Sequence, residues 1–262
     1  MNWIEALILG LVQGLTEFLP VSSSGHLEIG KALLQIEARE NLTFSIVVHG
    51  ATVLSILVVF FNDLKKMLID SMRFRYNESS AYLLKIILSM LPVAIVGVFF
   101  KSEVEAFFTG NIVFVGTMLL ITATLLTISF FIIPGSRKIG YLDAFIIGIA
   151  QAVAVLPGIS RSGATITTAL FLGNRREEAA RFSFLMVILP IIAANFIDLL
   201  GQEPVAGEKT GWFPLLVGFM TAFVAGLMAC KWMLSIVRKG KLLYFGLYCL
   251  VVGAIAIIAG LI

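Results

Sequence analysis

The chain reads Leu19-Pro-Val-Ser-Ser-Ser-Gly-His26 in the middle of one apolar stretch and Leu156-Pro-Gly-Ile-Ser-Arg-Ser-Gly163 in the middle of another. In each loop the proline ends the preceding helix, and the serine and glycine residues begin the next one. The stretches 3–36 and 141–172 are therefore predicted to be helix–loop–helix hairpins. Such a hairpin either crosses a membrane or returns to the side from which it entered.

The composition of the whole chain is that of an integral membrane protein. Apolar residues make up 59% of the 262 residues and charged residues make up 13%, against roughly 45–50% and 25% in soluble domains. These values exclude a soluble enzyme, a disordered chain, a collagen-like repeat and a secreted disulfide scaffold. The net charge of +3 gives no indication of a nucleic-acid partner.

Six further stretches are long enough to cross a bilayer, which takes about 20 apolar helical residues. They are 43–61, 81–100, 111–133, 181–200, 212–236 and 243–262. The chain is thus predicted to be all-α, with six transmembrane helices and the two hairpins.

The distribution of lysine and arginine predicts that both hairpins are re-entrant. If they return, thirteen basic residues fall on one side of the membrane and four on the other, whereas full crossings would divide the basic clusters in pairs. The thirteen are Lys65, Lys66, Arg73, Arg75, Arg137, Lys138, Arg175, Arg176, Arg181, Lys231, Arg238, Lys239 and Lys241, and the four are Lys31, Arg39, Lys101 and Lys209. Because basic residues concentrate in cytoplasmic loops, we expect both termini outside.

The chain also repeats itself at an offset of 138 residues. The matched pairs are Gly10 with Gly148, Gln13 with Gln151, Ser22 with Ser160, Ser24 with Ser162, Gly25 with Gly163, and Phe44-Ser45 with Phe182-Ser183. We expect a single membrane domain over 1–262 with repeats of approximately 1–133 and 139–262. Three spans separate the hairpins, and this odd number inverts the second copy. Inverted repeats with broken helices place a polar site near the midplane, where the loop tips meet.

The first hairpin carries the groups of acid–base or nucleophilic chemistry. Gln13 and Glu17 share a helical face, His26 follows the break, and three serines lie between. A carboxylate, an imidazole and a hydroxyl around one cavity suit general acid–base or nucleophilic catalysis. The alternative is that Glu17 caps a helix and the serines bind exposed backbone amides.

The second hairpin carries the groups of an anion site. Ser160, Arg161, Ser162 and Thr165 lie where a helix begins, and free amides, the helix dipole and a guanidinium together bind anions. Phosphate is the natural ligand because the arginine fork matches its oxygens. The alternative is that Arg161 pairs with Glu17 as a buried structural ion pair.

Both loops resemble those of the bacterial undecaprenyl pyrophosphate phosphatase family, which is linked to bacitracin resistance. The resemblance rests on Gln13-Gly-Leu-Thr-Glu-Phe-Leu-Pro-Val-Ser-Ser-Ser-Gly-His26 and on Pro157-Gly-Ile-Ser-Arg-Ser-Gly-Ala-Thr165. It implies hydrolysis of undecaprenyl diphosphate to the monophosphate carrier of peptidoglycan synthesis. It also implies a bacterial cytoplasmic membrane, a site open to the outer face, and a divalent cation, magnesium or calcium. The implied partners are the polyprenyl diphosphate lipid and the bilayer, with no nucleic acid and no protein partner.

The resemblance also implies roles for individual residues. Glu17 and His26 are the acid–base pair, Arg161 holds the diphosphate, and Ser23 is a catalytic hydroxyl. The substrate-binding residues are Gln13, Ser22, Ser24, Ser160, Ser162 and Thr165. Either Ser23, His26 or an activated water attacks phosphorus. Related chains can carry glutamate at position 13, so the metal ligands stay open here, with Glu17 as a candidate.

Two other classes of protein share parts of this pattern. A type-2 phosphatidic acid phosphatase also has a Ser-Gly-His triplet, but it needs a second histidine, and no histidine follows Arg161. A secondary transporter or flippase of a lipid phosphate or small anion fits the inverted repeat equally well. The discriminating feature is Glu17 with His26, because a carrier needs an anion clamp but no acid–base pair.

Overall fold

A computed structural model describes residues 1–34, 42–72, 77–108, 110–201 and 211–261. These residues form helices and one isolated β-bridge, between Arg137 and Asn174, so the predicted all-α class is confirmed. Four basic residues that enter the predicted charge asymmetry lie outside the described residues: Arg39, Arg73, Arg75 and Lys209.

Five helical segments are long and apolar enough to cross a bilayer, and a bent pair of helices is a sixth candidate. The five are α5 (Glu78–Phe99), α7 (Ile112–Phe131), α10 (Arg176–Met186) continued by α11 (Ile188–Gly201), α12 (Trp212–Arg238) and α13 (Leu243–Leu261). The bent pair is α3 (Leu42–Val59) with α4 (Phe61–Ser71), which meet at 74°. The chain is therefore a multi-pass membrane protein. A short helix, α6 (Lys101–Glu105), follows α5.

The structure differs from the expected spans at two places. The segment 62–80 was predicted to be a loop, but it contains α4, in which Leu64 and Met67 face the protein and Lys65 and Lys66 are exposed. Apolar residues three apart on one face make this an amphipathic helix. The stretch 181–200 was predicted to be one span, and a single candidate span is present over Arg176–Ile197, but a turn at Val187 divides it into α10 and α11. Pro190 lies in the first turn of α11, the part of a helix in which its missing N–H is tolerated.

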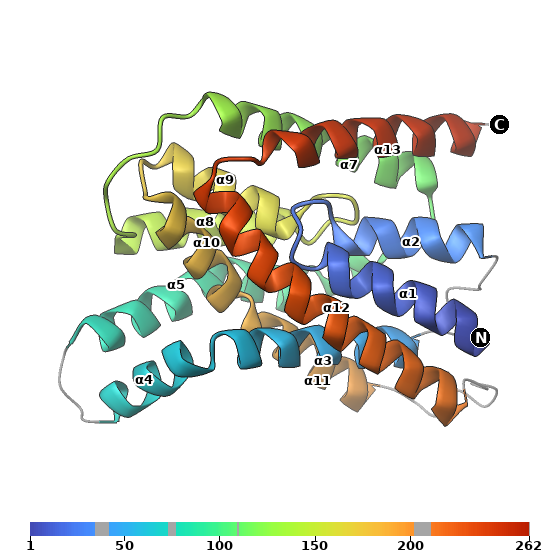
Figure 1. The fold of residues 1–262 in the computed structure, drawn as a ribbon, viewed down its shortest axis with the longest axis horizontal. Coiled ribbons are helices and arrows are strands. Elements are labelled where there is room, and N and C mark those ends of the chain that lie inside the picture. The colour runs from blue at the N-terminus through green and yellow to red at the C-terminus, as the bar shows by residue number, and fades with distance from the viewer. Residues whose placement is uncertain (35–41, 73–76, 109, 202–210, 262) are drawn as a thin grey trace.

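The two predicted hairpins are present as broken helices. The first consists of α1 (Trp3–Thr16) and α2 (Ser23–Leu33), and the second of α8 (Tyr141–Val153) and α9 (Arg161–Phe171). In Figure 1 both connecting loops lie near the centre of the molecule, and each hairpin returns toward the end at which it began. The N-terminus and the C-terminal end of α13 lie at the same end of the molecule (Figure 1).

Each hairpin packs against a long helix from the other half of the chain. Gly10 of α1 lies on α12, where a Cβ atom would come within 2.6 Å of the Gly218 carbonyl oxygen. Gly148 of α8 lies on α5, where a Cβ atom would come within 2.3 Å of the Ser89 carbonyl oxygen. Small residues allow membrane helices to approach this closely. Aligned glycines of the two halves thus make equivalent contacts, each with the opposite half.

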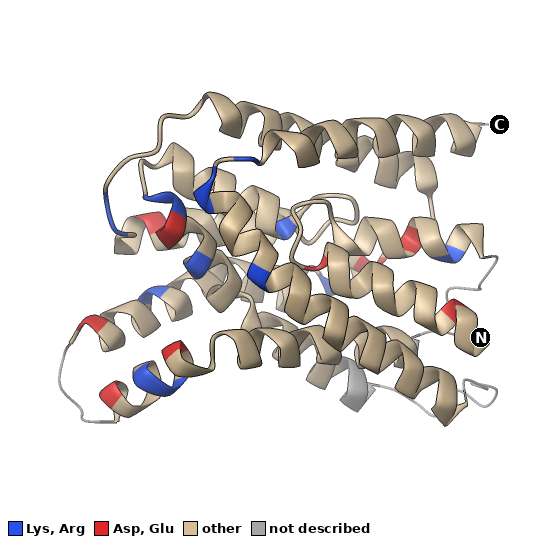
Figure 2. Cartoon of the chain, in the orientation of Figure 1, with Lys and Arg blue, Asp and Glu red and all other residues tan. Residues whose placement is uncertain are grey.

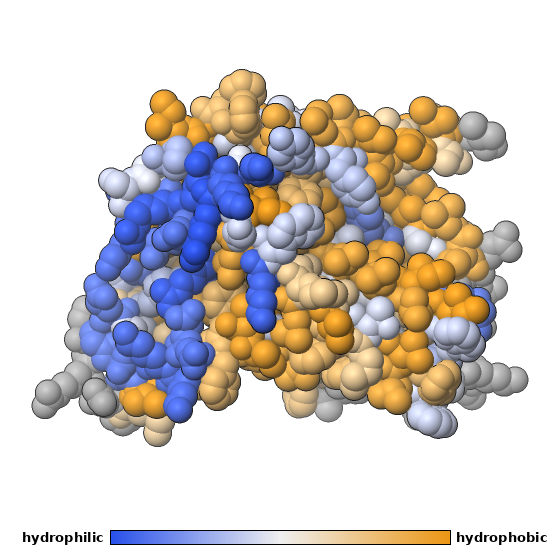
Figure 3. Space-filling view, viewed as in Figure 1, coloured by the Kyte–Doolittle hydropathy of each residue, from blue (hydrophilic) through white to orange (hydrophobic). Residues whose placement is uncertain are grey.

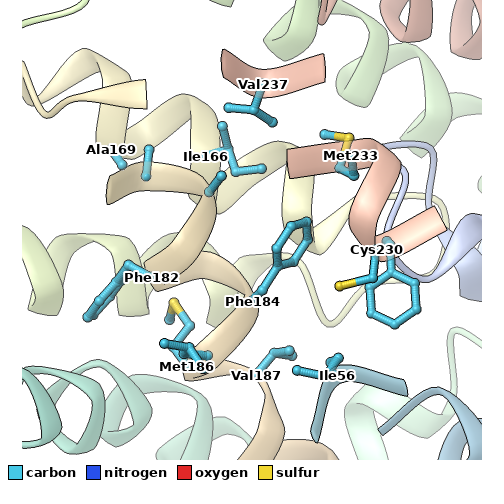
Figure 4. Packing of buried hydrophobic residues seen from close by; sticks show 14 of the residues in the cluster. Ile56, Ile166, Ala169, Phe182, Phe184, Met186, Val187, Cys230, Met233 and Val237 are labelled. Atoms are coloured by element: carbon cyan, nitrogen blue, oxygen red, sulfur yellow. The ribbon is translucent and has the colours of Figure 1, made fainter. Parts of the chain in front are cut away.

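The core lies around α10, where several buried apolar side chains meet. Phe184 and Val187 are 2% and 5% exposed, and Figure 4 shows Val187 beside Ile56 of α3 and Phe184 above it. These side chains form part of one cluster that joins α3, α10 and α12. Helix α10 is therefore packed on several sides, and its contacts with α9 help to hold the second loop tip in place.

The surface is apolar over most of its extent and polar at one end. Figure 3 shows the hydrophilic side chains gathered at the end of the molecule away from the termini. Figure 2 shows that most lysine and arginine residues lie there, on α4 and around the connections between α7 and α8, α9 and α10, and α12 and α13. An apolar surface with one basic end is typical of a membrane protein.

Candidate functional site

The two loop tips meet, and Ser22 joins them. The Ser22 Oγ accepts hydrogen bonds from the Gly25 N–H of its own hairpin at 3.3 Å and from the Gly158 N–H of the other hairpin at 3.1 Å. Ser22 has a φ of +70°, which is uncommon for a residue other than glycine and is maintained only where the surroundings require it. Gly158 has a φ of +100°, and a Cβ atom there would lie 2.5 Å from the Val115 carbonyl oxygen. The backbone conformation of both loop tips is therefore restricted.

A residue that the sequence analysis did not identify, Thr122 of α7, supports the second tip. Its Oγ1 donates to the Gly158 carbonyl at 2.9 Å and accepts from the Ser160 N–H at 2.9 Å. Thr117 and Thr124 of the same helix instead donate to their own helix carbonyls. The sequence shows several threonines in one apolar helix and gives no signal that singles out Thr122.

Glu17 is the centre of the site. It ends α1 and is 8% exposed. Its Oε2 accepts hydrogen bonds from Gln13 Nε2 at 2.9 Å and from Ser23 Oγ at 2.7 Å. Its Oε1 forms an ion pair with Arg161 of the other hairpin. The structure thus brings four of the predicted residues together. Because the Ser23 hydroxyl donates a hydrogen bond to the Glu17 carboxylate, Ser23 is a candidate nucleophile and Glu17 is its candidate base.

A small cavity adjoins this cluster. It is lined by Glu17, Phe18, Ile56, Arg161, Ser162, Ser183, Phe184 and Val187. The Arg161 side chain is 29% exposed and that of Glu17 is 2% exposed. The predicted alternative, an ion pair between Arg161 and Glu17, is therefore observed. It does not decide between a structural and a catalytic role, because the same two groups face the cavity.

His26 forms its hydrogen bonds with groups other than Glu17. Its Nδ1 bonds to the Ser22 carbonyl at 2.8 Å, so this nitrogen is the donor, and its Nε2 bonds to the Tyr248 hydroxyl at 2.9 Å. The two rings stack with centroids 5.5 Å apart. The hydrogen bond at one ring nitrogen determines which nitrogen of a histidine carries the proton, and the two bonds together fix the orientation of the ring. Tyr248, in the last helix, is thus a positioning residue that the sequence analysis missed.

The other predicted hydroxyls mostly bond to the hairpins themselves. Ser22 caps α2, so the predicted capping alternative is observed for this serine, and Ser160 caps α9 in the same way. Thr165 donates to the Arg161 carbonyl at 2.9 Å, Ser24 lies 3.4 Å from the Ser22 hydroxyl, and Ser162 donates to the Leu19 carbonyl at 3.4 Å. Their contacts with a substrate stay predictions.

The residues of this site do not fit a resident divalent cation. No group of three histidine, cysteine, aspartate or glutamate side chains clusters anywhere in the described part of the chain. Glu17 is the carboxylate of the site, and an arginine, a hydroxyl and an amide already engage it. Calcium needs several oxygen ligands, and magnesium usually binds one or two carboxylates together with phosphates of the substrate.

A family model and the relatives with similar sequences agree on one protein family. The sequence matches the family described as "Bacitracin resistance protein BacA" over residues 6–255. It is 54% identical to a protein named undecaprenyl-diphosphatase from Bacteroides fragilis (strain YCH46) over 263 residues, which cover 98% of each chain. It is 52% identical to an undecaprenyl-diphosphatase from Bacteroides thetaiotaomicron over 265 residues, which cover 100% of each chain. It is also 39% identical to an undecaprenyl-diphosphatase from Oceanobacillus iheyensis, over 97% of this chain and 96% of the relative.

Proposed function

This chain belongs to the family of the bacitracin resistance protein BacA, and from that membership we propose that it hydrolyses undecaprenyl diphosphate to undecaprenyl phosphate and inorganic phosphate. The activity would recycle the lipid carrier of peptidoglycan synthesis and confer bacitracin resistance. The observation that carries the proposal is the meeting of Glu17, Ser23 and Arg161 at the joined loop tips. A carrier of lipid phosphates would need the arginine but not a carboxylate bonded to a serine hydroxyl.

Two routes to these products use the same groups. In one, Ser23 Oγ attacks the terminal phosphorus, its proton passes to Glu17, and the anhydride bond breaks to release undecaprenyl phosphate. Water then cleaves the phosphoserine, giving inorganic phosphate and restoring Ser23. In the other, a water beside Glu17 attacks directly and gives the same products in one step. Both ring nitrogens of His26 are engaged, which favours Ser23 or water over His26 as the nucleophile.

Arg161 acts on the charge of the substrate. Phosphoryl transfer depends mainly on positioning and on neutralising charge at the phosphate oxygens. When the diphosphate binds Arg161, Glu17 loses its partner and is free to take a proton. The family resemblance implies a divalent cation, magnesium or calcium, and this cation would reach the site on the diphosphate, since no dedicated ligand set is found among the described residues.

The proposed arrangement in the membrane is six spans, with α3 as the first, and two re-entrant hairpins related as an inverted repeat. The exchanged packing of α1 on α12 and α8 on α5 supports this arrangement. The basic end of the molecule (Figure 2) would face the cytoplasm. As the family resemblance implies, the site between the loop tips would open to the outer face of the cytoplasmic membrane.

Cysteine labelling tests this topology. With a membrane-impermeant thiol reagent on intact cells, Lys66→Cys and Lys239→Cys should stay unlabelled, because both lie at the basic end. Gly211→Cys, before α12, should label. The native Cys230 and Cys249 are buried, so the parent protein provides the background. Labelling of Lys66→Cys in intact cells would overturn the re-entrant arrangement.

The activity is tested with purified protein in detergent. Undecaprenyl diphosphate should yield one inorganic phosphate per lipid, measured by phosphate release, and undecaprenyl phosphate should yield none. The carrier alternative makes the opposite prediction: no phosphate is released, whereas the lipid phosphate changes leaflet when the protein is placed in liposomes.

A further inference from the structure

Ser183 of α10 is a buried hydroxyl that the proposed mechanism has not used. It is 4% exposed, and its Oγ has no hydrogen-bond partner among the residues that the structure describes. It lines the cavity that Glu17 and Arg161 also line. Buried polar groups are nearly always hydrogen-bonded, and an exception indicates a ligand, a water or a functional role.

Three other buried serine hydroxyls on helices form hydrogen bonds with carbonyls of their own helices. Ser55 donates to the Ala51 carbonyl at 3.1 Å, Ser89 to the Ile86 carbonyl at 2.7 Å, and Ser129 to the Leu126 carbonyl at 2.6 Å. Such bonds to a carbonyl three or four residues earlier are the usual solution for a helical serine. Ser183 makes no such bond, so its hydroxyl is available to a group in the cavity.

The location separates Ser183 from other unpartnered groups. Thr167 Oγ1 and the Gln151 amide also lack partners within the described residues, but neither lines the cavity. The neighbours of Ser183 on the wall formed by α10 and α3 are Phe184, Val187 and Ile56, which are apolar (Figure 4). Ser183 is therefore the polar group that α10 presents to a cavity otherwise polar only at the loop tips.

We propose that Ser183 Oγ donates a hydrogen bond to a phosphate oxygen of the diphosphate that Arg161 holds. This inference rests on the proposed function, because it names a further contact with the same substrate. A phosphate oxygen is a strong acceptor, and the bond would give the hydroxyl the partner that it lacks. It would also place the substrate between the second hairpin and α10, so that the diphosphate has a fixed position relative to Glu17.

Ser183→Ala tests the proposal. A hydrogen bond to a charged group corresponds to about 10- to 100-fold in affinity or rate, so kcat/KM for undecaprenyl diphosphate should fall by that factor. The thermal midpoint of the free protein should stay the same or rise, because alanine removes a buried group without a partner. Ser129→Ala is the matched control, since it removes a buried hydroxyl bonded to its own helix, and it should retain parental kcat/KM.

A second measurement separates this proposal from the proposed activity. A methylene-bridged, non-hydrolysable analogue of farnesyl diphosphate should raise the thermal midpoint of the parent and of Ser129→Ala, and should raise that of Ser183→Ala much less. If the parent binds the analogue but releases no phosphate from the natural substrate, the activity fails and the Ser183 contact stands. Parental kcat/KM and a full thermal shift in Ser183→Ala would overturn the contact. The contact would also be overturned if Ser183→Ala without ligand had a lower thermal midpoint and its loss of activity were explained by unfolding. A parent that neither binds the analogue nor hydrolyses the lipid overturns both.

Discussion

We expect the replacement of Glu17 with glutamine to lower the turnover of undecaprenyl diphosphate by about 10²- to 10⁴-fold, the usual contribution of a positioned acid or base. Glutamine keeps the length and shape of the side chain, and its carbonyl oxygen can still accept the Ser23 hydrogen bond seen at 2.7 Å. It cannot take the proton that Ser23 or water must lose. The measurement is kcat from phosphate release by purified protein at saturating substrate.

The control for Glu17→Gln is Glu28→Gln in the same hairpin. Glu28 is also 8% exposed and also pairs with a cation, Lys31, at 3.3 Å. Each substitution removes one partner of a buried ion pair, which destabilises a protein, so both variants should have a lower thermal midpoint. Only Glu17→Gln should lose turnover while folded. Near-parental turnover of Glu17→Gln would refute the catalytic role and leave Glu17 as a structural partner of Arg161.

The hairpins could be predicted from the sequence because their signals are local. Proline, serine and glycine in the middle of apolar stretches end one helix and begin another within a few residues. The bend between α3 and α4 and the division between α10 and α11 were not predicted. Helix α4 is amphipathic and lies outside the apolar spans, so its hydropathy signal is weak. Pro190 lies in the first turn of α11, and a proline at that place does not show where the preceding helix ends.

The residues of the site divide in the same way. Glu17 and Arg161 stand out in the sequence because an ionisable group in an apolar helix is unusual. Thr122, Ser183 and Tyr248 do not stand out, because hydroxyl groups are common in apolar spans. The partners of Thr122 and Tyr248 also come from distant segments: Tyr248 bonds to a histidine 222 residues away. Only the fold brings these groups together.

The two hairpins differ at one pair of glutamines that the sequence alignment matches. Gln13 donates to Glu17, four residues later. The aligned Gln151 has Val155 at the equivalent place, and both polar atoms of its amide lack partners among the described residues. The second hairpin thus has the glutamine without a carboxylate at the equivalent place. In the proposed mechanism one hairpin supplies the proton acceptor, Glu17, and the other supplies the cation that binds the phosphate, Arg161.

We expect the replacement of Arg161 with lysine to lower the rate of hydrolysis by at least about two orders of magnitude, because arginines contribute about 10³–10⁵ to the rate in other phosphoryl-transfer enzymes. Lysine keeps the positive charge, so a site that needs only electrostatic attraction would lose little. A guanidinium can bond two phosphate oxygens at once through a planar fork, whereas an ammonium is a compact point charge. Arg161 also begins α9 at the joined tips, so a surface loop cannot move to correct the shorter reach of lysine.

The matched control for Arg161→Lys is Arg181→Lys. Arg181 also pairs with a carboxylate, Asp63, at 2.8 Å, and it does not line the cavity. Lysine can keep an ion pair at either position, so both variants should fold and insert, and only Arg161→Lys should lose phosphate release. Hydrolysis by Arg161→Lys at close to the parent rate would show that bulk charge suffices and that no bidentate contact is made. If Arg161→Lys fails to fold while Arg181→Lys folds, the contact of Arg161 with Glu17 is primarily structural. The anion clamp would then have to be sought in the backbone amides at the start of α9.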